Sequence, residues 1–506
     1  IGRESKWQNS RILGKNNTVI VGAGMAGLAA AIRLAARGEP VTLLEKQTYP
    51  GGKMRQLQVA DALIDAGPTV FTMKWVFDQL FDESGDSFDV SVGLNKADTL
   101  ARHAWDNQGS FDLHADRGQT EAAIGDFFGA RSATGYREFC ADARSIFETL
   151  QYTFMAATRP NPMQLSYRIG LHRLPTLWNL KPFHTLWQVL DSYFPDPRLQ
   201  QLFGRYATYV GSSPFQAPAT LMLIAHVEQE GVWYIDGGMH ALALAMRDRA
   251  TSLGVDFRPD SEVSGIIVES GSAVGVALTS GEEVRGERIV YCGDISRLNA
   301  DYFSNAKSPT SPVKPKHRAL SAITWNVVAK TSDFPLHRHN VFFSGDYPAE
   351  FEAIFQNGQV PIEPTVYVCA QNRNDNSQLI SGEKDHMLCL INAPAFGDSR
   401  RLTKFEMETH WGATSAKMNQ CGLKLERAER QATATQPVDF NELFPGSGGA
   451  LYGRASHGWL ASFQRPGSKT ALPGFYIAGG STHPGAGVPM ATLSGMLAAE
   501  QIRQDC

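Results

Sequence analysis

Three glycines near the start of the chain have the spacing of a loop that binds the phosphates of a dinucleotide. Gly22, Gly24 and Gly27 form a G-x-G-x-x-G, and Glu45 follows 18 residues after Gly27. In such a loop the first glycine permits a tight turn, the second lets a pyrophosphate approach the backbone, and the third lets helix and strand pack closely. The acid at Glu45 can accept hydrogen bonds from ribose hydroxyls and disfavours a 2′-phosphate. The spacing therefore predicts a dinucleotide site, with NAD and FAD both open.

These residues need a strand–helix–strand unit to position them, and the sequence around them has that pattern. The apolar, β-branched run Thr18–Val21 predicts a buried strand, the alanine-rich run after Gly27 predicts a helix, and Val41–Leu44 predict a second strand that ends at Glu45. The amino terminus of the helix would present its positive end to the phosphates.

A second glycine motif follows the acid-ended strand and favours FAD. PGGKMR (50–55) comes a few residues after Lys46, and DAGPTV (65–70) follows it. A glycine pair with a basic residue at this place can contact the far side of a longer cofactor. The alternative is an ordinary glycine turn, which leaves the tandem arrangement unexplained.

The composition excludes several classes of protein. The 506-residue chain is 43% hydrophobic and 19% charged, so it can bury a large core and is not intrinsically disordered. Its 47 Lys+Arg against 51 Asp+Glu give a formal net charge of −4, which argues against nucleic acid as a partner. The six cysteines lie far apart and form no C-x-x-C, so we expect reduced thiols.

Four motifs together resemble one known family. PGGKMR, DAGPTV, EGVWYIDGGMHALALAM (230–246) and GFYIAGGSTHPGAGVPMATLSG (474–495) occur in the order and spacing of the phytoene-desaturase family of bacterial carotenoid desaturases, which are amine-oxidase-like flavoproteins. The resemblance runs from about Val19 to Ile502. The ending HPGAGVPMATLSG is most similar to the branch of 3,4-desaturases that act on 1-hydroxylated acyclic carotenoids.

The resemblance implies an FAD site with two halves. At the carboxyl end of the chain, Phe475–Ala478 predict a strand, and a glycine loop then leads to a helix that begins near Pro489. That helix would direct its positive end at the pyrimidine ring of the flavin. In relatives, the backbone at the position of Val263 holds the adenine. Ser481 stands where many flavoproteins of the wider class have an acid, so no carboxylate is carried over. The implied cofactor contacts are Gly22, Gly24, Met25, Ala26, Gly27, Glu45, Lys46, Gly52, Lys53, Met54, Arg55, Gly67, Pro68, Thr69, Val70, Val263, Gly479, Gly480, Val488, Pro489 and Met490.

The implied reaction removes two hydrogens from adjacent carbons of a carotenoid and introduces a C3–C4 double bond, with hydride passing to FAD. Arg144 matches an arginine that relatives place near the substrate, although the family's acid three residues earlier is Ala141 here, with Asp142 shifted by one. The alternative is that Arg144 is a cation on a helix surface. His483 is predicted near the flavin edge, where it could accept the released proton through water or only shape its loop.

No metal is predicted, because the His-Arg-His stretch 337–339 has no further ligand at metal-binding spacing, and we interpret it as a solvated loop. A quinone or O₂ is the expected electron acceptor.

A basic, aromatic segment in the middle of the chain predicts contact with a membrane. Residues 151–190 contain Arg159, Arg168, Arg173 and Lys181 and no Asp or Glu, interleaved with Tyr, Phe, Trp and Leu. This pattern is typical of a membrane-surface element, although a helical lid over the core is the alternative. A long polyene cannot cross water at a useful concentration, since exposure costs roughly 0.8 kcal/mol per CH₂. We therefore expect peripheral, monotopic attachment to the cytoplasmic face of a membrane.

We expect an α/β fold in which an amine-oxidase-like, Rossmann-type FAD-binding domain is discontinuous in sequence. Residues 261–268, 272–278 and 288–291 predict a three-stranded meander in it, while VYVCA (366–370), HMLCLINAP (386–394) and a helix within 401–418 belong to an α+β substrate domain. The expected parts are 15–100, 225–300 and 450–503 for the FAD-binding domain, 101–224 for a helical, membrane-facing insert, and 301–449 for the substrate domain.

Three alternatives stay open at this point. A phytoene desaturase would act on a carotenoid without the 1-hydroxyl. An amine-oxidase-like flavoenzyme would need a polar, aromatic-caged pocket. A non-enzymatic prenyl-lipid carrier with the architecture of the GDP-dissociation inhibitors would be colourless, whereas a complete flavin site predicts a yellow protein.

Overall fold

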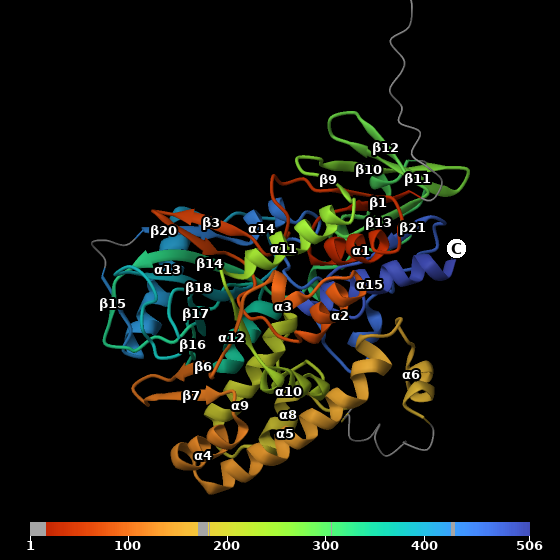
Figure 1. The fold of residues 1–506 in the computed structure, drawn as a ribbon. Helices are drawn as coiled ribbons and strands as arrows, with labels where there is room; N and C mark the ends of the chain where they lie inside the picture. The colour runs from red at the N-terminus through yellow and green to blue at the C-terminus, as the bar shows by residue number, and fades with distance from the viewer. Residues whose placement is uncertain (1–16, 171–180, 182, 305, 427–430, 506) are drawn as a thin grey trace, which may run out of the picture.

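The computed structural model describes residues 17–170, 181, 183–304, 306–426 and 431–505. Two large sheets lie beside each other, and a layer of helices lies below both in the view of Figure 1. In the described residues no helix is long and apolar enough to cross a membrane.

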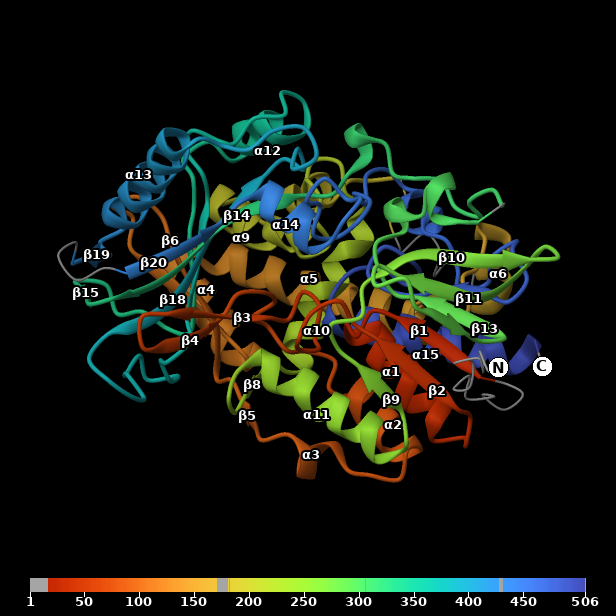
Figure 2. The same ribbon diagram turned by 90° about the horizontal axis from the view of Figure 1, so that it is seen from above.

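The first sheet is parallel and has the strand order β21-β13-β1-β2-β9. The helix α1 (Met25–Ala35) follows β1 directly, and all its residues except Arg33 are buried. Figure 2 shows α11 (Met239–Ser252), α1 and α15 (Val488–Asp505) along this sheet, and α1 packs against both of the others. The predicted strand–helix–strand unit and the carboxyl-terminal strand and helix are confirmed. The strands are β1 (Thr18–Val21), β2 (Val41–Leu44), β9 (Asp256–Arg258), β13 (Arg288–Tyr291) and β21 (Phe475–Ile477).

The predicted meander exists, but its third strand was placed wrongly. Antiparallel strands β10 (Val263–Glu269), β11 (Ser272–Leu278) and β12 (Glu283–Arg285) form it. Residues 288–291, predicted as the third strand, are β13 and lie between β1 and β21 in the parallel sheet. The reason is burial: β12 alternates exposed and buried positions as an edge strand does, whereas β13 is a nearly continuous buried run that suits a parallel strand covered on both faces.

The second sheet has seven strands in the order β20-β14-β18-β17-β16-β6-β7, of which only β16 and β6 pair in parallel. Every residue of β14 is buried, and α13 (Lys404–Gln420) lies beside the sheet (Figure 2). The predicted strands at 366–370 and 386–394 and the helix within 401–418 are confirmed. The strands are β6 (Thr99–Ala104), β7 (Ser110–His114), β14 (Ser321–Ala329), β16 (His339–Phe342), β17 (Val366–Ala370), β18 (Asp385–Ala393) and β20 (Gln431–Thr435).

The helical layer begins later than the predicted insert 101–224. The boundary at residue 101 falls inside β6, and both β6 and β7 extend the seven-stranded sheet. The division into domains as a whole stays a prediction. The helices of the layer are α4 (Arg117–Phe128), α5 (Ala130–Leu150), a π-helical turn at Gln151–Met155, α6 (Pro162–Ile169), α8 (Leu186–Tyr193), α9 (Pro197–Gly204) and α10 (Leu223–Glu230).

Smaller elements connect these layers. A hairpin of β3 and β4 follows the second glycine motif, and two further short strand pairs, β5 with β8 and β15 with β19, lie outside the large sheets. Their bounds are β3 (Gln56–Val59), β4 (Ala62–Asp65), β5 (Leu94–Lys96), β8 (Trp233–Ile235), β15 (Thr331–Ser332), β19 (Lys424–Leu425), α2 (Trp75–Glu83), α3 (Phe88–Ser91), α12 (Tyr347–Phe355) and α14 (Pro437–Leu443).

Candidate functional site

The first glycine loop sits at the carboxyl end of β1 and opens onto the amino terminus of α1. A Cβ atom on Gly27 would lie 1.9 Å from the carbonyl oxygen of Gly22, so only glycine fits where helix and strand cross. Gly22 itself has φ +99°, which other residues rarely adopt. The amino-terminal end of α1 has no side-chain cap, and the first turn of this helix has no acidic residue. Its first N–H groups, those of Met25 and Ala26 among them, are therefore suited to a phosphate.

The second glycine pair lies against the first loop. The N–H of Gly51 donates to the carbonyl of Ala23 (2.8 Å), and a Cβ on Gly52 would lie 3.2 Å from the Cα of Gly24. The segment 65–70 continues this stack, because a Cβ on Gly67 would lie 1.9 Å from the carbonyl oxygen of Lys53. The two motifs that the sequence places about 25 residues apart thus form one cradle whose floor is backbone.

Glu45 ties the end of β2 to the same loop. Its carboxylate is buried and accepts hydrogen bonds from the N–H groups of Ala23 (2.8 Å) and Gln47 (2.9 Å). Burial raises the pKa of Glu45. The N–H of Ser261 donates to the carbonyl of Glu45, which brings the approach to β10, and with it Val263, close to this strand end.

The carboxyl-terminal loop reaches the same edge of the sheet. The N–H of Ala478 donates to the carbonyl of Tyr291 at the end of β13, and the N–H of Gly479 donates to Ser494 Oγ in α15 (3.1 Å). A Cβ on Gly495 would lie 2.0 Å from the carbonyl oxygen of Ala26, so α15 packs directly on the first turn of α1. The glycine loops from the two ends of the chain therefore lie at one sheet edge, as the predicted two-part site requires.

The other predicted contact residues lie in the cradle, in α15 or against segments that follow β14 in the chain. Met54 is buried under the cradle, and Val488 and Pro489 are buried in the first turn of α15. The three basic residues have protein partners instead: Arg55 donates to Thr435 Oγ1 on β20 (3.1 Å), Lys46 to the carbonyl of Glu442 (3.0 Å), and Lys53 to the carbonyl of Leu451. The remaining predicted positions are partly buried: Gly67, Pro68, Thr69, Val70, Val263, Gly480 and Met490.

Two supporting residues were missed by sequence reasoning. Arg465 is buried and donates to three carbonyls, of which that of Gly480 (2.7 Å) belongs to the glycine loop; burial lowers the pKa of Arg465 to about 10. The carboxylate of Asp65 accepts from the N–H of Met239 (2.6 Å) and so caps α11. A Cβ on Gly238 would lie 2.4 Å from that carboxylate, so the two motifs that contain these residues fit together. Asp65 could have been found from the motifs, whereas Arg465 lies in no motif.

His483 is buried and neutral. Its Nε2 lies 3.0 Å from the carbonyl oxygen of Phe154 and 2.9 Å from that of Ala157, and because both partners only accept, Nε2 carries the proton. Burial lowers the pKa of His483 to about 4. Its Nδ1 has no hydrogen-bond partner among the described residues and is free to accept a proton or a hydrogen bond. The ring also lines a cavity of about 200 Å³ with Arg159 and Lys469.

Arg144 lies on the exposed face of α5. It forms an ion pair with Glu148 (2.7 Å), one turn along the helix, and its side chain is 59% exposed. Asp142, the acid shifted by one position, pairs instead with Lys181 (2.8 Å). This is the geometry of a surface cation, and the catalytic role of Arg144 stays a prediction.

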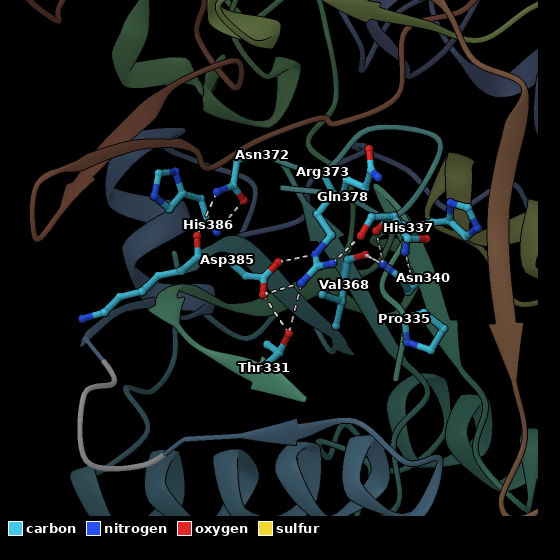
Figure 3. Close-up of polar contacts among 12 residues, drawn as sticks. Thr331, Pro335, His337, Asn340, Val368, Asn372, Arg373, Gln378, Asp385 and His386 are labelled. Carbon is cyan, nitrogen blue, oxygen red and sulfur yellow. Dashed lines mark hydrogen bonds and ion pairs between the residues drawn. The ribbon is translucent and has the colours of Figure 1, made fainter. Parts of the chain in front are cut away.

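The interpretation of residues 337–339 as a solvated loop is wrong. His337 and His339 are both buried, because the side chain of Asn340 closes the turn before β16: its Oδ1 accepts from the N–H of His337 and its Nδ2 donates to the carbonyl of Val368 (Figure 3). In the part of the chain that the structure describes, no three His, Cys, Asp or Glu side chains are grouped to hold a metal ion.

The same view shows a buried ion pair that fixes the neighbouring loop. Arg373 and Asp385 pair at 2.5 Å, and Thr331 Oγ1 donates to the same carboxylate (2.7 Å) (Figure 3). These contacts hold the loop between β17 and β18 against β15 and have no metal-ligand character.

The geometry therefore fits FAD: an uncapped helix terminus, a backbone cradle, an acid for a ribose, and a second helix terminus from the far end of the chain. Residues 25–503 match the flavin-containing amine oxidoreductases, and the chain belongs to this family. A particular group within it is also clear, because the chain is 46% identical over 489 residues to a hydroxyneurosporene desaturase of Rubrivivax gelatinosus, covering 96% of this chain and 93% of the relative.

Two further comparisons agree. A 1-hydroxycarotenoid 3,4-desaturase of Flavobacterium sp. (strain P99-3) is 28% identical over 500 residues, which is 96% of this chain and 98% of the relative. The solved structure of a putrescine oxidase bound to putrescine matches with a TM-score of 0.60 at 12% identity, covering 97% of this chain and 99% of that one. The second similarity shows the fold alone. The predicted family, fold class and FAD cofactor are confirmed.

Proposed function

We propose that the protein is an FAD-dependent carotenoid desaturase that introduces a C3–C4 double bond into an acyclic, 1-hydroxylated carotenoid. The observation that carries this proposal is the 46% identity to a hydroxyneurosporene desaturase along nearly the whole chain. The convergence of both glycine loops on one sheet edge supports it, because a redox role needs the complete flavin site.

Each part of the cofactor would have its own support. Bound FAD would supply the hydride acceptor. The first turn of α1 and the cradle of Gly24 and Gly52 would hold the pyrophosphate, the carboxylate of Glu45 a ribose, and the backbone at Val263 the adenine. The amino terminus of α15, which has no acidic residue in its first turn, would favour negative charge on the flavin ring.

The proton that leaves the carotenoid needs an acceptor in a dry site. His483 is suited to this role because it is neutral and its Nδ1 is unpartnered, while its Nε2–H is fixed by two carbonyls. Because Nδ1 is itself buried, a water molecule would have to carry the proton to it.

The deciding experiment compares substrates. FAD-loaded protein is incubated in liposomes with 1-hydroxyneurosporene, with phytoene and, separately, with amines, and the products are separated by chromatography. We expect a 3,4-desaturated product from the hydroxylated carotenoid and little or none from the others. Oxidation of amines alone, or a colourless protein without flavin, would contradict the proposal and support the amine oxidase or the lipid carrier.

We also propose that the protein docks peripherally on the cytoplasmic face of a membrane. Two large apolar side chains on α6 are exposed, Met163 (82%) and Tyr167 (79%). Arg168 lies beside them and faces no acid in its contacts, which are to Thr153 and Thr158. Tyr152, Phe183 and Trp459 extend the exposed set. Of the predicted segment, residues 171–180 and 182, which include Arg173, lie outside the described residues.

Flotation with anionic and neutral vesicles tests the docking. We expect binding to anionic vesicles, weakened by Tyr167→Glu and unchanged by Phe405→Glu. Phe405 is the matched control because its side chain is also exposed (77%) but stands on α13, away from α6 (Figure 1). Failure of the unaltered protein to float would contradict the proposal.

A membrane position would also give access to a quinone as electron acceptor, and anaerobic turnover with added quinone distinguishes it from O₂.

A further inference from the structure

Three polar side chains from distant parts of the sequence form a chain between the cofactor cradle and the seven-stranded sheet. Thr69 Oγ1 lies 2.6 Å from the hydroxyl of Tyr367 on β17, and that hydroxyl lies 2.8 Å from Nδ1 of His339 on β16. Thr69 stands two residues after Gly67, which packs on the carbonyl of Lys53 in the cradle. The chain therefore begins beside the cofactor loops.

The far end of this chain is unsatisfied. His339 is only 3% exposed, yet its Nε2 has no hydrogen-bond partner among the described residues. A buried polar atom without a partner is costly, so it requires an explanation such as a bound water molecule or a ligand. Burial, with Arg338 and Arg205 nearby, lowers the pKa of His339 to about 3, so the ring is neutral and carries one proton. The hydroxyl of Tyr367 can donate either to Nδ1 or to Thr69 Oγ1; when it donates to Nδ1, the imidazole proton is on Nε2 as an unused donor.

The residues between His339 and the cradle are less buried than the strands around them. Residues 67–70 and Tyr367 are only partly buried, while the other residues of β16 and the strand positions on either side of Tyr367 are fully buried. The turn closed by Asn340 holds the start of β16 (Figure 3), and His339 is the first residue of this strand. The imidazole of His339 is therefore held in place, and only Tyr367 and Thr69 separate it from the cradle.

We propose that His339 Nε2–H, oriented by Tyr367 and Thr69, binds the C1 oxygen of the substrate and makes the enzyme selective for 1-oxygenated carotenoids. This inference rests on the proposed function. C1 is only two carbons from C3 in the carotenoid. The residue that binds the C1 oxygen must therefore lie near the part of the flavin that accepts the hydride. The hydrogen bonds through Tyr367 and Thr69 connect the imidazole of His339 to the cradle. A carotenoid without this oxygen would leave the donor unpaired, which is how a polar site discriminates strongly.

The test compares two substrates in several variants. The ratio of kcat/KM for 1-hydroxyneurosporene to that for neurosporene is measured in FAD-loaded protein. We expect the ratio to fall roughly tenfold or more in His339→Leu and Tyr367→Phe, with the activity on neurosporene largely kept. Tyr234→Phe is the matched control. Tyr234 is an aromatic residue next to His339, but its hydroxyl forms a hydrogen bond with Asp375 and with none of Thr69, Tyr367 and His339.

A second readout separates this inference from the proposed function. Protein is equilibrated with an equal mixture of the two carotenoids in liposomes, and the bound pigments are extracted and quantified without turnover. Preference for the hydroxylated carotenoid, lost in His339→Leu and kept in Tyr234→Phe, supports the inference. An unaltered ratio in all variants, or an equal loss on both substrates, overturns it. Absence of any desaturated product together with selective binding would reject the proposed function and leave the recognition site supported.

Discussion

The two sides of the candidate site are built from different materials. On the cofactor side, glycines bring backbone against backbone, and a Cβ on Gly27, Gly67 or Gly495 would lie about 2 Å from a carbonyl oxygen. On the side of the seven-stranded sheet, the contacts are made by side chains such as Tyr367 and His339, which come from neighbouring strands. Backbone contacts bind the part of the ligand that all family members share, and side-chain contacts are free to change with the substrate.

The largest effect is expected where the backbone contact is closest. Gly27→Ala would place a Cβ 1.9 Å from the carbonyl oxygen of Gly22, so helix α1 must move and the phosphate cradle must open. We expect the purified protein to lose most of its flavin absorbance and to melt at a lower temperature. Gly412→Ala in α13 is the control: its Cβ would meet nothing within 4 Å, and we expect it to be neutral or to stabilise by about 0.5–1 kcal/mol. A yellow, fully stable Gly27→Ala protein would contradict this account.

A smaller effect is expected at the acid of the cofactor side. Glu45→Ala removes the acceptor for the N–H groups of Ala23 and Gln47 as well as the expected ribose contact. We expect the affinity for FAD to fall about 10- to 100-fold, since each charge-assisted hydrogen bond contributes roughly 1.5–3 kcal/mol. Titration of the apoprotein followed by flavin fluorescence measures this loss. Glu45→Gln keeps one acceptor, so its affinity for FAD should lie between those of the unaltered protein and Glu45→Ala. Equal affinities in all three proteins would exclude a role for Glu45.

The same contrast explains what the sequence could reveal. The strand–helix–strand unit, the second glycine pair and the carboxyl-terminal helix are local patterns with fixed spacing, so they were predicted. The assignment of 288–291 to the meander failed because a strand's partners depend on long-range burial, which its four residues do not encode. The pairing of Thr69 with Tyr367, 298 positions away, has no local signal at all.

The buried imidazole of His483 should make the stability of the protein depend on pH. The pKa of His483 is lowered from 6.5 to about 4, so the folded state holds this ring neutral while the unfolded state binds a proton below about pH 6.5. The stabilisation is present above pH 6.5 and is lost as the pH falls toward 4, by up to about 3 kcal/mol. We expect His483→Gln to flatten the fall in unfolding free energy over this range. The exposed His184 is the control, and an unchanged slope in His483→Gln would show that another group is responsible.

The smallest effect is expected at Arg144, where the two interpretations of the sequence differ most. Solvent screens an exposed ion pair one turn apart on a helix, so Arg144→Ala should alter stability very little. As a surface cation it would change kcat/KM for the carotenoid by less than about twofold, whereas a residue that stabilises the transition state would cost about 100-fold or more. Glu148→Ala breaks the same ion pair and is the matched control. A large loss in Arg144→Ala, with normal flavin content and a normal Glu148→Ala enzyme, would contradict the surface interpretation. It would mean that α5 brings this arginine to the substrate during turnover. The side chains that contact the substrate would then come from the helical layer as well as from the seven-stranded sheet.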